Sequence, residues 1–144
     1  MTETTVLRGH PGVGPNTEGV ALVCDEGFSA RYDYDRYRGV ISRETHPLYG
    51  QSISGKIVVF RTSKGGVATS WMMLDMAERG TCPAGFIFGR TNPVMVQGAV
   101  LANVALMHEL EPDPLATIRT GDTVRMRPAE GVVEVVRRRK KACQ

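Results

Sequence analysis

The chain has few of the residues that build disulfide frameworks or metal cages. Its 144 residues include three cysteines, Cys24, Cys82 and Cys143, and no Cys-x-x-Cys spacing. Three cysteines so far apart indicate neither a disulfide framework nor a local metal cage. His10 and His108 also lack a second ligand at metal-binding spacing. We therefore expect no metal site formed by this chain alone.

Long apolar runs are missing as well. No stretch approaches the roughly 18 apolar residues that a membrane helix needs. Residues 1–5 show neither the basic nor the apolar region of a secretory signal. With 42% hydrophobic and 23% charged residues, the composition is that of a globular domain with one core. We expect a cytoplasmic protein without membrane contact.

Positive charge is concentrated at the C-terminal end. The formal net charge is +3, and the run Arg137–Lys141 carries +5, which leaves about −2 for residues 1–136. We predict one domain over residues 1–136 and a basic tail over residues 137–144. No aromatic residues interleave with the run, so a solvated tail is favoured over a nucleic-acid site. Contact with an acidic partner surface is the alternative.

A strand, a glycine-bearing turn and a helix form the most informative segment. Lys56–Phe60 is a buried apolar run, residues 61–66 form the turn, and the pattern predicts a helix over 65–79 ended by Gly80. A helix that opens directly after a strand presents unpaired N–H groups and the positive end of its dipole. The segment therefore predicts a site for a carboxylate or phosphate, with Lys64 adding a mobile positive charge.

The turn matches neither known phosphate-binding pattern. Its lysine precedes the adjacent glycines Gly65 and Gly66, unlike a Walker A loop, and no Gly-x-Gly-x-x-Gly occurs. A purely structural turn, with Ser63 as the helix cap, is the alternative to an anion site. Thr69 and Ser70 fall one turn into the helix, where hydroxyls commonly bond to the main chain.

The helix itself is apolar on more than one side. Val67, Trp71 and Leu74 follow the spacing of a core-facing stripe. We expect this stripe to be buried. Three methionines should fill the core beside it and widen the buried surface, namely Met72, Met73 and Met76.

The other elements predict a compact α/β domain with a mixed sheet. A terminal hairpin is indicated, with its first strand at the edge of the sheet. The expected strands are 20–24, 56–60, 85–89, 104–107, 123–127 and 132–136, and a second helix is expected over 94–101 with Pro93 at its first position.

Residues 28–50 lack clean periodicity and form a long loop with aromatic and charged content. All four tyrosines of the chain lie there, which indicates a structured loop surface or rings that cap the end of the sheet. His46 in this loop either orients a substrate or a partner residue, or is satisfied by the backbone.

Several segments within residues 39–108, in a fixed order, resemble the aconitase X swivel domain, and a weaker likeness extends over residues 18–136. They are Gly39–Ile41, His46–Gln51, Ser54–Phe60, the glycine turn with its helix, and Gly98–Val100. The resemblance implies a swivelling β/β/α domain related to the mobile fourth domain of aconitase. Such small subunits dock onto a large subunit that carries three cysteines and an iron–sulfur cluster, with the active site at the interface.

Members of that family dehydrate hydroxy acids, notably cis-3-hydroxy-L-proline and phosphomevalonate, and the swivel domain supplies a serine as proton acceptor. The family turn, Gly-Arg-Gly-Ser, falls on Ser63–Gly66, so the serine position is occupied by Gly66, whereas Ser70 matches a second family serine. Either Ser63 or Ser70 takes over the base role, the partner provides it, or the chemistry differs. An aromatic-glycine stretch of the family is replaced by Ala30–Asp33, and Arg31 there indicates a different substrate.

We therefore predict the small subunit of a two-chain hydro-lyase acting on a small hydroxy acid, most simply one like cis-3-hydroxy-L-proline. A phosphomevalonate dehydratase small subunit and a non-catalytic swivel-fold binding module are the alternatives. Elimination needs a Lewis-acid iron that this chain cannot supply, so the large subunit is required. The predicted catalytic residues are Ser70 and Ser63, and the predicted substrate-binding residues are Lys64, Gly65, Gly66, Thr69, His46 and Arg31.

Overall fold

A mixed sheet of seven strands in the order β1-β9-β8-β2-β5-β6-β7 forms the centre of the molecule. The computed structural model describes residues 2–30, 32–64 and 68–138. Strands β2, β5, β6 and β7 run parallel, and β1, β9, β8 and β2 pair antiparallel. The elements are β1 (Thr2–Arg8), β2 (Thr17–Phe28), β3 (Tyr34–Asp35), β4 (Val40–Ile41), β5 (Ile57–Ser63), α1 (Ala68–Arg79), β6 (Gly85–Arg90), α2 (Pro93–Ala102), β7 (Ala105–His108), α3 (Pro114–Thr117), β8 (Thr123–Arg127), a 3₁₀ turn (Pro128–Glu130) and β9 (Val132–Arg138).

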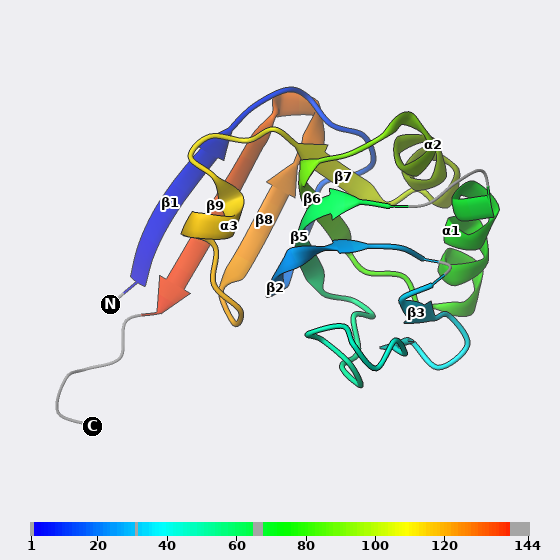
Figure 1. Cartoon of the computed structure of the whole chain (residues 1–144). Coiled ribbons are helices and arrows are strands. Elements are labelled where there is room, and N and C mark those ends of the chain that lie inside the picture. Colours follow the sequence, from blue (N-terminus) through cyan, green and yellow to red (C-terminus); the bar gives the residue numbers. More distant parts are fainter. Residues whose placement is uncertain (1, 31, 65–67, 139–144) are drawn as a thin grey trace, which may run out of the picture.

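Two cores lie on opposite faces of the parallel strands. Figure 1 shows α1 and α2 together at one side of the molecule and β1, β9 and β8 at the other. Successive side chains of a strand point to opposite faces, so Val58 and Phe60 join the core under the helices, while Ile57 and Val59 join the core on the other face. Within the described residues, no helix is long and apolar enough to span a membrane.

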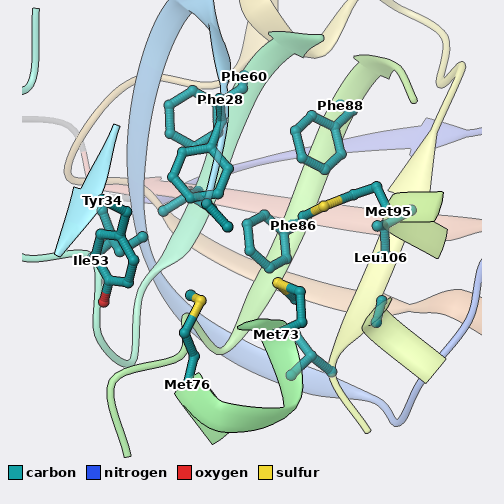
Figure 2. Close-up of a cluster of buried hydrophobic side chains, with 14 of the residues drawn as sticks. Phe28, Tyr34, Ile53, Phe60, Met73, Met76, Phe86, Phe88, Met95 and Leu106 are labelled. Carbon is teal, nitrogen blue, oxygen red and sulfur yellow. The ribbon is translucent and has the colours of Figure 1, made fainter. Parts of the chain in front are cut away.

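Aromatic rings and methionines fill the core under the helices (Figure 2). The rings of Phe28 and Phe60 stack with centroids 5.0 Å apart, and those of Phe86 and Phe88 with centroids 5.5 Å apart. The three methionines of α1 are buried with them, which confirms their predicted role. Because thioether side chains are flexible, they fit the irregular space beside stacked rings.

The predicted burial of the apolar stripe of α1 is wrong for Trp71 and Leu74, and its third member, Val67, lies outside the described residues. Trp71 is 54% exposed and Leu74 is 39% exposed. The methionine side of α1 faces the sheet and α2, and the two helices approach so closely that a Cβ on Gly98 would lie 3.0 Å from Cγ of Met73. The outward Trp71 ring is instead covered by the Arg36 guanidinium, 5.1 Å from its centroid.

The other predicted strands and the second helix agree with observed elements to within a few residues, whereas β1, β3, β4 and α3 have no predicted counterpart. β8 pairs on both sides, with β9 and β2, so its predicted edge position is wrong. Its alternation reflects burial of one face only. The edge strands are β7 and β1, and the polar sequence of β1 gave no apolar signal. β9 continues to Arg138, so Arg137 belongs to the sheet and not to the expected tail, and residues 139–144 lie outside the described residues.

Candidate functional site

The carboxyl ends of the four parallel strands meet at one edge of the sheet. β2 ends at Phe28, β5 at Ser63, β6 at Arg90 and β7 at His108. In open α/β sheets the crevice beyond these ends is the usual ligand-binding position. The strand–turn–helix segment singled out in the sequence lies at this edge.

Lys64 stands at the end of β5 and is exposed. Its backbone N–H donates to the Phe28 carbonyl at 2.7 Å, which extends the β2–β5 pairing by one residue. Its side chain passes over Gly27, because a Cβ added there would overlap Cε of Lys64 and lie 3.1 Å from Cγ and Cδ. The predicted ligands Gly65 and Gly66 lie outside the described residues, so the structure describes one of the three members of the expected anion site.

Ser63 is half-buried and faces the neighbouring strand. Its Oγ lies 2.9 Å from Oγ1 of Thr91, the residue directly after β6. Either hydroxyl is able to donate in this pair. Thr91 was not among the predicted residues, since nothing in the sequence relates position 91 to position 63.

The two hydroxyls inside α1 have different surroundings. Ser70 Oγ donates to the Val94 carbonyl at 3.3 Å and so joins α1 to the first turn of α2. The sequence anticipated a main-chain partner for this hydroxyl, and the partner lies on the second helix. Thr69 is 2% exposed, which leaves it little surface for a ligand and weighs against its predicted binding role.

His46 is 3% exposed and both of its ring nitrogens have backbone partners. Nε2 lies 3.3 Å from the Gly27 carbonyl, and Nδ1 accepts the Leu48 N–H at 3.1 Å. These partners place the ring proton on Nε2. The ring also meets Phe60 edge-on, with centroids 6.1 Å apart. The geometry favours the alternative of a backbone-satisfied histidine, which supports Gly27 beneath Lys64.

The long loop around His46 is held by buried polar contacts. Asp33 is buried, accepts the Ser29 N–H at 2.9 Å and forms an ion pair with Nε of Arg43 at 2.6 Å. The Tyr34 hydroxyl donates to the Thr81 carbonyl, and burial raises the pKa of this phenol. Of the tyrosines, Tyr34 alone joins the core, whereas the other three rings are exposed. Arg31, a predicted substrate ligand, lies outside the described residues.

A pocket of about 450 Å³ opens beside this edge of the sheet. It lies between the first two turns of α2 and the end of β7, and Thr91 connects it to Ser63. His108 lines it, with Nδ1 3.7 Å from the Glu109 carboxylate. The lining residues are Thr91, Asn92, Pro93, Val96, Gln97 and His108.

The described cysteines do not fit an iron–sulfur cluster. Cys24 is in the core, and burial raises the pKa of its thiol. Burial raises the pKa of the Cys82 thiol to about 12, whereas cluster ligation requires thiolates. Residues 2–30, 32–64 and 68–138 contain no group of three His, Cys, Asp or Glu side chains able to hold a metal ion.

A layer of parallel strands that carries two helices on one face and antiparallel strands on the other defines a β/β/α swivel domain, as the sequence predicted. Ser63 and Lys64 lie at the edge of this layer where the parallel strands end. The chain belongs to the aconitase X swivel domain family, whose model matches residues 6–135.

Solved structures and curated relatives agree with this assignment. The chain is similar to Thermococcus kodakaraensis aconitase X (holo-form), with a TM-score of 0.84, 26% identity, and coverage of 91% of this chain and 98% of that chain. It is 29% identical over 129 residues to the phosphomevalonate dehydratase small subunit of Methanocella arvoryzae, covering 90% of this chain and 98% of the relative. It is 33% identical over 118 residues to the protein of that name from Methanopyrus kandleri, covering 82% and 87%.

Proposed function

We propose that this chain is the small subunit of a two-chain dehydratase that removes water from phosphomevalonate. The observation that carries this proposal is the similarity to phosphomevalonate dehydratase small subunits over 98% of the Methanocella arvoryzae protein's length. Phosphomevalonate was the alternative substrate in the sequence analysis. A cis-3-hydroxy-L-proline-like acid stays as a second candidate substrate.

The reaction places two demands on the site. Elimination removes a proton from the carbon next to the carboxylate and hydroxide from the following carbon, so that a C=C bond and water are formed. The carboxylate has to be held, and a base has to reach the proton. Lys64, at the start of the turn into α1, supplies a cation for the carboxylate. The amides of Gly65 and Gly66 are its proposed partners.

Ser63 is the better placed of the two predicted serine bases. The Ser70 hydroxyl donates to the Val94 carbonyl, and a carbonyl oxygen would repel the alkoxide that a serine base must become. Ser63 lies at the edge of the sheet beside Lys64, whose positive charge favours an alkoxide. We therefore assign the proton to Ser63, which becomes a neutral hydroxyl on accepting it.

The large subunit completes the site in this proposal. It would hold the iron–sulfur cluster, since the described residues of this chain do not fit one, and a bound cluster supplies Lewis-acid assistance to the departing hydroxide. The small subunit contributes the carboxylate ligand and the base. Neither chain then has the full set of groups that elimination needs.

The test compares the purified chain with the complex obtained by co-expression with its large subunit. Both samples are incubated with 5-phosphomevalonate and, separately, with cis-3-hydroxy-L-proline, and the unsaturated products are quantified. We expect turnover of phosphomevalonate by the complex alone. Turnover by the small chain by itself would contradict the division of labour, and turnover of the hydroxyproline alone would replace the substrate. A stable complex without turnover of either acid would favour the non-catalytic binding module. The presence of Gly66 in the family serine position supports that alternative.

A further inference from the structure

We infer that Thr91 is a positioning residue for Ser63. The Thr91 hydroxyl donates a hydrogen bond to the Ser63 oxygen when that oxygen acts as the base. The inference rests on the proposed function and extends it to a residue on a different strand. Its starting point is the 2.9 Å separation between the two hydroxyl oxygens.

The backbone on both sides of Thr91 is fixed. Before it, β6 pairs in parallel with β5, with Arg90 opposite Thr62, which brings position 91 beside position 63. After it, Asn92 caps α2 through its side-chain oxygen, which accepts the Met95 N–H at 2.9 Å. A backbone held between a paired strand and a capped helix keeps the Thr91 oxygen beside Ser63, so little reorganisation is needed during the reaction.

The chemistry of the partner decides which serine is able to serve as base. Hydrogen bonds to the charged form of a group lower its pKa. A threonine hydroxyl can rotate to donate to an alkoxide, whereas the carbonyl beside Ser70 can only accept. Of the two predicted serine bases, Ser63 has a hydroxyl partner in the described structure, whereas Ser70 has a carbonyl partner.

The hydroxyl pair also borders space for a substrate. Thr91 lines the pocket of about 450 Å³, and the half-buried Ser63 contacts the Thr91 hydroxyl. Pockets of this size accommodate small metabolites. A substrate in this pocket would therefore lie beside the Thr91 hydroxyl that contacts Ser63.

The experiment uses the two-chain complex and three threonine substitutions assayed with 5-phosphomevalonate. Thr91→Val removes the hydroxyl at nearly constant volume, Thr91→Ser keeps it, and Thr123→Val on β8 is the matched control. We expect Thr91→Val to lower kcat by about 10- to 100-fold, the effect of losing a hydrogen bond to a charged group. KM should stay within about twofold and the rising limb of the kcat–pH profile should move to higher pH. Thr91→Ser and Thr123→Val should keep wild-type kcat and profile.

Several results would overturn the inference. They are a Thr91→Val enzyme with wild-type kcat, a loss confined to KM, an unshifted pH profile, or a Thr91→Ser enzyme as impaired as the valine variant. Thr91→Ala serves as a second hydroxyl-free variant should valine prevent assembly. In the Ser63→Ala background, Thr91→Val should have no further effect on kcat, and full additivity would contradict coupling. An inactive wild-type complex would instead reject the proposed function, so the two failures are distinguishable.

Discussion

The side chain of Lys64 lies over the α-carbon of Gly27, so that a Cβ at position 27 would overlap Cε of Lys64. The Gly27 carbonyl is in turn held by Nε2 of His46. A buried histidine, a glycine and an exposed lysine thus form a stack from the loop to the edge of the sheet. The position of the lysine charge depends on both residues beneath it.

Gly27→Ala should displace the Lys64 side chain. The methyl group would overlap Cε of Lys64, which is the mobile end of a flexible chain, so the lysine moves and the fold does not. We expect a KM for 5-phosphomevalonate raised about tenfold in the complex, with a melting temperature changed by at most a few degrees. In the Lys64→Ala background the same substitution should have no further effect. An additional increase of KM there would contradict a role exerted through the lysine.

His46→Ala should destabilise the chain. It removes the partners of the Gly27 carbonyl and the Leu48 N–H at a buried position, so urea unfolding should show a loss of about 1–3 kcal/mol. His10→Ala is the control, because that histidine is largely exposed, and it should leave the unfolding midpoint unchanged. A stable His46→Ala protein with an impaired KM would instead support direct substrate contact by the histidine.

Asp122 and Arg137 should make stability depend on pH. Burial alone would raise the pKa of Asp122, but hydrogen bonds from Arg137 and the Arg119 backbone outweigh it and hold the pKa below its usual range. A lowered carboxyl pKa stabilises the fold above the unfolded-state pKa of about 3.9, and this contribution disappears as the pH falls through the lower folded-state value.

Asp122→Asn should therefore lose about 1–3 kcal/mol at pH 7. The difference from wild type should stay constant down to about pH 5 and shrink below about pH 4, as the wild-type carboxyl is protonated. Asp25→Asn is the control, since its partner Arg61 is exposed, and it should unfold as the wild type does. A difference independent of pH from 7 to 2 would show that charge is not its cause.

Substitutions in α1 should distinguish its two apolar sides. Met73 is fully buried beside α2, so Met73→Ala should cost about 2–5 kcal/mol in urea unfolding. Trp71→Ala should cost clearly less, because that ring packs on Arg36 at the surface. A larger loss of unfolding free energy for Trp71→Ala than for Met73→Ala would support the buried face that the sequence spacing predicted.

Local patterns were sufficient for the strand–turn–helix segment and for the terminal hairpin. An apolar run such as Lys56–Phe60, bounded by turn residues, specifies its own structure. Local patterns did not predict which face of α1 is buried, since a helix with methionine, tryptophan and leucine on several sides has no unique apolar face. They also failed for β1, whose threonines and glutamate pair with β9 without forming a buried stripe.

The candidate site was accessible to sequence reasoning only where its residues are consecutive. Ser63 and Lys64 were found through the turn that contains them. The contact between Ser63 and Thr91 depends on the register of two strands separated by a helix, and sequence spacing carries no signal for it. The role of His46 depends in the same way on a carbonyl 19 positions earlier in the chain.

The most direct test of the account is the steady-state KM of the two-chain complex for 5-phosphomevalonate after Lys64→Ala, compared with Lys56→Ala at the opposite end of β5. Loss of a carboxylate-binding cation should raise KM at least about tenfold without altering assembly or melting temperature. Lys56→Ala should match the wild type. Equal KM values for the Lys64→Ala and wild-type complexes would contradict the claim that this strand–turn–helix junction holds the substrate's carboxylate.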